Sequence, residues 1–226
     1  MNLKVLSIVM GLLLSLCGYR ATAKSSEQNV EWKAKWISSG TTREQPNTWL
    51  NFRKEVNLPN VPTSVIARIG ADSKYWLWIN GKPVVFEGGL KRGPNPLDTY
   101  YDEVEIAPYL KRGENTIAVL LWYFGRPSFS HNDSGKAGLL FDCQTPSFDI
   151  LSNDSWKCEA NPAYGTCPPP DPNMRLAESN IRYDARKAGR AWHQPDFNAD
   201  EMPQAVDLRD ALGGQAGHHK RRSAAQ

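Results

Sequence analysis

Residues 75–86 read YWLWINGKPVVF, and this stretch decides the fold class. Its middle holds Asn80-Gly81, the strongest two-residue signal for a β-hairpin, because both central residues of a type I′ turn need φ > 0. The residues on either side are mostly aromatic, branched or otherwise apolar, which is typical of strands. The stretch therefore predicts a strand over 75–79, a tight turn, and a partner strand over 82–86.

Outward from this hairpin, short apolar segments alternate with turns rich in Gly and Pro. Further strands are expected at 48–58, 64–71, 101–106, 116–124 and 136–143, with one more short strand or turn at 149–157. The segment 116–124 is apolar almost throughout, which indicates a central strand buried on both faces. Eight or nine strands without a long helix predict an all-β fold, an antiparallel β-sandwich or jelly roll.

Composition and charge exclude several classes of protein. The 226 residues include eight Trp and eight Tyr and carry a formal net charge of +3. A chain this rich in aromatic residues is not a disordered polyampholyte or a collagen-like fibre. So small a positive surplus argues against a dedicated nucleic-acid-binding protein.

The first 23 residues have the pattern of a secretory signal peptide. Lys4 supplies the positive start, Leu6–Leu16 an apolar run too short to span a bilayer, and Ala21–Ala23 the small residues of a cleavage site. We therefore expect export to the periplasm or the cell surface. An alternative is a lipoprotein signal, in which Cys17 would be lipidated and would anchor the chain in the outer membrane. The bulky Leu16 before Cys17 favours simple cleavage.

The chain divides into four expected regions: the signal peptide at 1–23, a β-sandwich domain at 31–160, a linker with the start of a truncated second β domain at 161–207, and a disordered tail at 208–226. The boundary near residue 160 rests on composition, since the Pro-rich run at 167–172 cannot form a helix or a central strand. The tail holds little apolar matter, and its basic run at 218–222 is best explained as solvated.

Cleavage after Ala23 would leave Cys143, Cys158 and Cys167. The count is odd, so at least one thiol stays unpaired within the chain. Cys158 and Cys167 bracket a loop and could form a disulfide in an oxidising periplasm; the alternative is that all three are reduced and packed. No Cys-x-x-Cys spacing occurs, so a structural zinc site is not expected.

Residue patterns for catalysis are weak. Glycosidases need two carboxyl groups on opposite sides of a sugar ring, whereas Asp102, Glu103 and Glu105 follow one another along a single expected strand. The run Ser130–Asp133 indicates a polar turn, and no Gly-x-Ser-x-Gly nucleophile elbow is present. We therefore predict no catalytic residue and no metal site in this chain.

Sugar binding is the better candidate, because aromatic rings stack on the apolar faces of sugars and polar side chains bind the hydroxyls. Trp76 and Trp78 have the same parity in their strand and so share one face, while Trp122 ends the central strand, where it could reach the rim. The predicted carbohydrate-binding residues are these three for stacking, with Asp102 and Asn132 for hydroxyl contacts. The alternative is that the rings fill the core or an interface.

Several segments in order carry a family resemblance. They are Lys35-Trp36-Ile37-Ser38, Phe52-Arg53-Lys54, the hairpin strand with Asn80-Gly81-Lys82, Tyr101-Asp102, and Tyr109–Val119. Together they resemble the N-terminal β-sandwich region of bacterial α-L-rhamnosidases of glycoside hydrolase family 78, over roughly residues 31–205. The hairpin piece alone is shared by many galactose-binding-like sandwiches. Asn180–Arg186 is similar to the link between two sandwich domains in those enzymes.

The resemblance implies a non-catalytic role. In such enzymes the catalytic part is a large α/α barrel far downstream, and this chain resembles a region truncated before that barrel. The implied function is a structural and carbohydrate-binding module of an exported rhamnosidase-like enzyme, with a rhamnose-containing plant or bacterial glycan as partner. It implies no cofactor and leaves calcium open. The alternatives are an active α-L-rhamnosidase and a glycan-capturing surface lipoprotein anchored through Cys17.

Overall fold

The computed structural model describes residues 31–89, 99–129, 131–167, 176–188 and 191–208, and the backbone of 219–222. Trp32–Gln226 forms one compact unit. The expected signal peptide and Cys17 lie outside the described residues and stay predictions. Within the described part of the chain, no helix has the length and apolar character needed to cross a membrane.

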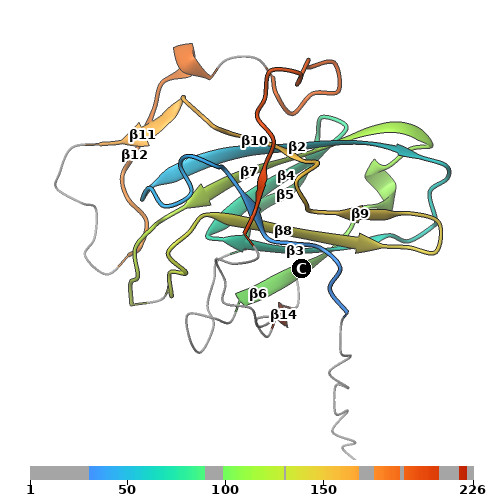
Figure 1. Cartoon of the computed structure of the whole chain (residues 1–226), viewed down its shortest axis with the longest axis horizontal. Helices are drawn as coiled ribbons and strands as arrows, with labels where there is room; N and C mark the ends of the chain where they lie inside the picture. Colours follow the sequence, from blue (N-terminus) through green and yellow to red (C-terminus); the bar gives the residue numbers. More distant parts are fainter. Residues whose placement is uncertain are drawn as a thin grey trace, which may run out of the picture. The chain divides into compact units, whose positions relative to one another are not determined.

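The compact unit is built from two large sheets and one small one (Figure 1). The first sheet has the strand order β13 (Val206–Asp207), β1 (Ile37–Ser38), β8 (Gly138–Gln144), β3 (Ile66–Asp72), β6 (Thr99–Glu105) and β14 (His219–Arg222), with β9 (Asp149–Leu151) also paired to β8. The second sheet has the order β10 (Lys157–Ala160), β2 (Thr48–Leu58), β7 (Gly113–Tyr123), β4 (Lys74–Ile79) and β5 (Lys82–Gly89). A two-stranded sheet pairs β11 (Tyr164–Thr166) with β12 (Ile181–Tyr183).

The all-β class and the antiparallel sandwich are confirmed. Every pairing between described strands is antiparallel except that of β14 with β6. The helical parts of the described residues are two short 3₁₀ turns, Ala107–Tyr109 and Ala185–Lys187. The strand β7 is central, as expected, and pairs with β2 over eleven residues on one side and with β4 on the other.

The hairpin predicted from Asn80-Gly81 joins β4 to β5. Both residues have positive φ, 52° and 76°, as a type I′ turn requires. The Asn80 side chain also donates to the oxygen Oδ1 of Asn115 (2.8 Å) and accepts from the backbone N–H of Thr116 (3.0 Å). These bonds fix the turn against the start of β7, so the turn has tertiary as well as local support.

The core between the two large sheets is aliphatic and aromatic. Alternate residues of β4, namely Tyr75, Leu77 and Ile79, are fully buried in it, as are Phe52 of β2 and Val119 of β7. The other parity of the same strands faces away from this core. Trp76 and Trp78 therefore lie together on the outer face of the five-stranded sheet, which confirms that the two rings share one face.

Residues 161–207, expected as a linker and the start of a second β domain, pack onto the sandwich where they are described. β13 pairs with β1, and Gln204 forms an isolated bridge with Lys157 of β10. The backbone N–H of Leu208 donates to the carbonyl of Trp36 (2.9 Å). A further domain beyond this segment stays a prediction, as does disorder of the tail, which lies largely outside the described residues.

The three described cysteines are free thiols. Cys158 lies buried on β10, where burial raises the pKa of its thiol well above the ordinary value. Cys143 is also buried, on β8, and burial raises the pKa of its thiol to about 12. Of the two alternatives, the structure has the reduced, packed cysteines and no Cys158–Cys167 bond.

Candidate functional site

A second apolar cluster lies on the outer face of the five-stranded sheet. It combines rings from β2, β4 and β7 with rings from the segment that follows β10: Trp49, Trp76, Trp78, Trp122, Phe124, Tyr164, Trp192 and Phe197. Trp49 is at its centre and stacks on Trp122 (4.6 Å between ring centroids), on Tyr164 (4.0 Å) and on Trp76 (5.5 Å). The outer face of the sheet is therefore covered by the chain itself.

Hydrogen bonds join the segment that follows β10, which covers the outer face, to the sheet. The indole Nε1 of Trp122 donates to Oδ1 of Asn47 (2.8 Å), and Nδ2 of Asn47 donates to the hydroxyl of Thr166 in β11 (2.8 Å). Asn47 adopts the left-handed region at φ 51°, which Asn tolerates better than most residues. Trp122 is only 5% exposed, so the expectation that it reaches a wet rim is wrong.

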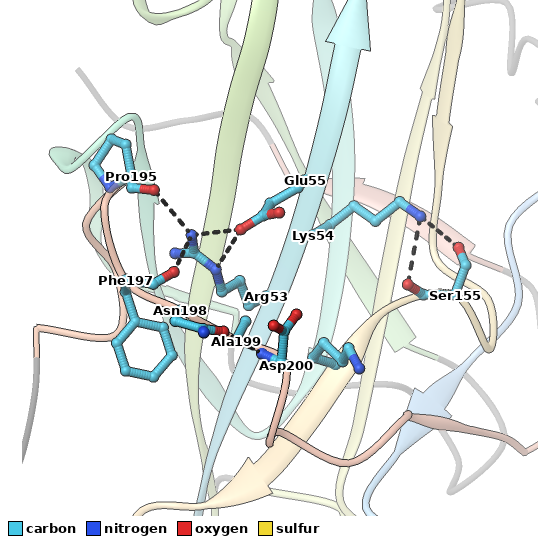
Figure 2. A pocket seen from close by; sticks show the side chains of 10 residues that line it. Arg53, Lys54, Glu55, Ser155, Pro195, Phe197, Asn198, Ala199 and Asp200 are labelled. Carbon is cyan, nitrogen blue, oxygen red and sulfur yellow. Dashed lines mark hydrogen bonds and ion pairs between the residues drawn. The ribbon is translucent and has the colours of Figure 1, made fainter.

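Arg53 is the most unusual residue of the outer face. Its side chain is buried, yet both terminal nitrogens find partners (Figure 2). Nη1 donates to the carbonyls of Trp192 and Gln194, each at 2.8 Å, and Nη2 donates to Oε1 of Glu55 at 2.7 Å and to the carbonyl of Phe197 at 3.3 Å. A planar guanidinium offers five donors in a fixed fork, which suits this set of acceptors.

A pocket of about 380 Å³ opens beside Arg53. Two sheet strands and two loops line it: Arg53, Lys54 and Glu55 of β2, Lys157 of β10, Ser155, and the run Pro195, Phe197, Asn198, Ala199 and Asp200. Figure 2 shows Lys54 reaching toward Ser155 and the Asp200 carboxylate turned into the space between the two sides. The pocket is polar, with a single aromatic ring.

Three of the five charged side chains that line the pocket, those of Arg53, Lys54 and Glu55, are already engaged. Nζ of Lys54 donates to the carbonyl and the hydroxyl of Ser155, at 3.4 and 2.5 Å. Burial lowers the pKa of the Lys54 ammonium, while Asp154 opposes that shift. Glu55 is held by Arg53. Among the described residues, the side chains of Lys157 and Asp200 have no hydrogen-bond or ion-pair partner, which leaves them available to a ligand.

The structure brings together only part of the predicted set. Trp76 and Trp78 lie half-buried beside each other on the outer face of β4, with Phe86 of β5 in edge contact with Trp76 (6.3 Å). Trp122 belongs to the same cluster but is covered. Asp102 is on β6, in the other large sheet, and Asn132 lies in the loop before β8. The five residues therefore do not form one site.

Asp102 links the two sheets. Its Oδ2 accepts from the hydroxyl of Tyr75 in β4 (3.1 Å) and from the backbone N–H of Gly89 in β5 (2.8 Å). These bonds occupy one oxygen of the carboxylate in holding the edge of the sandwich together. Asp102, predicted to contact sugar hydroxyls, thus holds the two sheets together.

Among the described residues, one cluster of potential metal ligands lies near Asn132. Ligand atoms of Asp72, His131 and Asp133 lie within 4.8 Å of one another. The Asp72 carboxylate already accepts from the hydroxyls of Ser73 (2.9 Å) and Ser134. Calcium prefers six to eight oxygen ligands, and a cluster with a His nitrogen and hydrogen-bonded carboxylate oxygens does not fit it. Ser73 is fully buried, so its hydroxyl cannot meet a substrate.

Residues missed by the sequence analysis share one property: they come together only through the segment after residue 160. Arg53 and Trp49 are an even number of residues apart on β2, so they lie on the same, outer face. A large aromatic ring on that face was the one sequence feature that indicated a covered surface. No signal joined Lys157 to Asp200 or Phe197, because nothing in the polar, Pro-rich segment predicts where it docks.

Comparison with solved structures shows what this chain is similar to. The glycoside hydrolase family 78 rhamnosidase of Bacillus sp. GL1 matches with a TM-score of 0.73 and 26% identity, over 85% of this chain and 20% of that one. The α-L-rhamnosidase of Aspergillus terreus matches with a TM-score of 0.59 and 22% identity, over 78% of this chain and 21% of that one. The resemblance to α-L-rhamnosidases is confirmed, and this chain spans about a fifth of their length. No protein-family model and no curated protein sequence matches the chain.

Proposed function

We propose that this chain is a non-catalytic β-sandwich module of an exported α-L-rhamnosidase-like glycoside hydrolase, corresponding to the N-terminal region of such enzymes and able to bind glycan. The observation that carries the proposal is the match to the Bacillus rhamnosidase over 85% of this chain but 20% of that enzyme. A module of that share supplies one β-sandwich. The hydrolytic carboxylates belong to another part of the enzyme.

The pocket chemistry supports a non-catalytic role. Hydrolysis with inversion uses two carboxyl groups about 6.5–9.5 Å apart, one of them a general acid and both free to act on opposite sides of the ring. Of the two carboxylates that line the pocket, Glu55 is already paired with Arg53 through Oε1 (2.7 Å), and Asp200 is the one without a partner in the described structure. A single available carboxylate can bind hydroxyls but cannot perform both steps.

Two surfaces support glycan binding. One is the half-buried pair Trp76 and Trp78 with the exposed Phe86; the other is the pocket beside Arg53. Aromatic rings next to polar groups are the usual elements of sugar recognition. Single-sugar contacts bury little area, so we expect a Kd near ~1 mM. We propose a rhamnose-containing plant or bacterial glycan as the partner.

The test is to assay the purified full chain for hydrolysis and for binding separately. Incubation with an aryl α-L-rhamnoside should release no aryl alcohol above a heat-denatured control. Affinity electrophoresis in gels containing a rhamnose-rich polysaccharide should retard the chain relative to a gel without it. Turnover that copurifies with the chain would overturn the non-catalytic part. Equal mobility in both gels, with no response to free sugars by NMR, would overturn the binding part.

The proposal of export depends on the first 23 residues, and it is tested by whether a bacterial host removes them. When the chain is expressed with its own leader, the mass of the product should correspond to loss of residues 1–23. A lipidated product that starts at Cys17 and disappears in the Cys17→Ala variant would favour the surface lipoprotein instead. A full-length product in the cytoplasm would contradict export altogether.

A further inference from the structure

We infer that the pocket beside Arg53 is a subsite for one neutral pyranose ring, bound through Lys157 and Asp200 and seated against Phe197. This inference rests on the proposed glycan-binding function and names the place where the sugar binds. It differs from the surface that the sequence favoured, which is centred on Trp76 and Trp78.

The size of the pocket suits one sugar ring. Its volume is about 380 Å³, at the lower end of the range for small-molecule sites, ~300–1,000 Å³. One side is formed by neighbouring sheet strands, since Lys157 of β10 is directly paired with Arg53 of β2. The other side is the loop 195–200. A binding surface built on paired strands is held more rigidly than one built on loops alone.

Arg53 makes the loop side of the pocket rigid. Its guanidinium donates to the carbonyls of Gln194 and Phe197 and lies 5.5 Å from the centre of the Phe197 ring. The loop is therefore held by charge-assisted hydrogen bonds that persist without a ligand. A binding site that is already ordered loses less conformational entropy when a ligand binds.

The polar groups left free define the ligand. Lys54 is used by Ser155, and Glu55 by Arg53. The side chains without a partner in the described structure are then Lys157, a donor, and Asp200, an acceptor. Asn198 adds an amide whose Oδ1 accepts from the backbone N–H of Asp200 (2.8 Å), so its NH₂ remains free to donate. Adjacent sugar hydroxyls both donate and accept, and they match such a mixed set.

The free carboxylate of Asp200 disfavours an acidic sugar. Lys157 and Asp200, the two side chains without a partner, carry opposite charges, while the Lys54 ammonium is already held by Ser155. A sugar carboxylate placed near Lys157 would also approach Asp200, and like charges at close range are destabilising. The Phe197 ring, which is half-buried, offers an apolar surface for the C–H face of the ring.

The polar neighbours of the Trp76 surface are engaged instead. Lys74 lies two residues before Trp76, on the same face of β4, and forms ion pairs with Glu87 (3.8 Å) and Glu178 (3.4 Å). A sugar on that surface would find rings but few free polar groups. Because hydroxyls that lose water need new partners, the pocket is the better site.

The experiment compares matched variants of the full chain by ligand-observed NMR titration with L-rhamnose, D-galactose and D-galacturonate. Asp200→Asn and Lys157→Gln each remove one charge from the pocket, and we expect each to weaken binding of a neutral sugar at least tenfold. Asp149→Asn in β9 and Lys82→Gln in β5 make the same chemical changes on strands that do not line the pocket, and both should stay within twofold of the wild type. Thermal unfolding of all four checks that each variant is folded.

The outcomes separate this inference from the proposed function. If the wild type binds a neutral sugar and Asp200→Asn binds equally well, while Phe86→Ala loses binding, the pocket is not the subsite but the glycan-binding module stands. If the wild type binds none of the sugars and is not retarded by polysaccharide, both fail. Tighter binding of D-galacturonate than of both neutral sugars would overturn the charge argument while keeping the pocket.

Discussion

The two faces of the five-stranded sheet are both covered along β2 and β7, but by different chemistry. The inner face presents aliphatic and aromatic side chains such as Phe52, Leu77 and Val119 to the opposite sheet. The outer face presents Trp49, Trp122 and the buried Arg53 to a segment with little regular structure. The inner face is stabilised by apolar burial. The outer face also depends on hydrogen bonds from buried polar groups, above all Arg53 and the indole of Trp122. The inner face should therefore lose stability when a buried side chain is shortened. The outer face should lose stability when a hydrogen-bond donor is removed.

Phe52→Ala should have the largest effect, because it opens a cavity in the fully buried inner core. Replacing a buried Phe by Ala costs about 3–5 kcal/mol of unfolding free energy. Urea denaturation followed by Trp fluorescence gives the value. A loss below about 1 kcal/mol would mean that the two sheets are not closely packed at this position and that the contrast between the faces is incorrectly drawn.

Arg53→Met tests the outer face with a side chain of similar length. The apolar stem is retained, but four backbone carbonyls and Glu55 lose a donor. We expect a loss of about 2–4 kcal/mol, since removing one partner leaves buried polar groups unpaired.

Limited proteolysis distinguishes local from global loss in this variant. New cleavage confined to 190–200 would mean that Arg53 holds the segment in place. Arg53→Lys keeps the charge without the planar fork and should lie between the wild type and Arg53→Met. Equal stability of all three would remove the argument for donor matching.

Trp122→Phe and Trp49→Phe form a matched pair on the same face. Both lose similar ring area, but Trp122 donates to Asn47, whereas the indole nitrogen of Trp49 has no partner among the described residues. Trp122→Phe should therefore cost about 1–2 kcal/mol more than Trp49→Phe. Differential scanning calorimetry of the two variants measures the difference. The opposite order would mean that stacking, and not hydrogen bonding, determines the outer face.

The smallest effect should be a dependence of stability on pH at His193. Burial, and then the charge of Arg53, lower its pKa below the ordinary 6.5. The unfolded chain therefore binds the proton more readily, so the contribution of His193 is present above pH 6.5 and is lost as pH falls below it. His193→Gln should flatten the unfolding free energy between pH 7.5 and 5 relative to the wild type. An unchanged profile would contradict the assignment.

The same contrast explains what the sequence could and could not predict. The hairpin at 75–86 and the shared face of Trp76 and Trp78 follow from turn chemistry and parity, which are local. The cover on the outer face does not, since residues 161–208 lack any period that would predict how they dock. The pocket could not be predicted because Lys157, Phe197 and Asp200 come together only when that segment docks. The burial of Arg53 could not be predicted either, because Arg is mostly exposed in proteins.

The hydrogen bond from Arg53 to the carbonyl of Trp192 joins residues 139 positions apart in the sequence. Contacts of such long separation form slowly, because the loop must close before they contribute any stability. If the sheet assembles first, Trp49 and Trp122 face water until the covering segment docks, and exposed aromatic surface favours aggregation. Docking of that segment as a separate late step would give a second, slower phase of Trp fluorescence. The polar pocket is then the last part of the molecule to be completed.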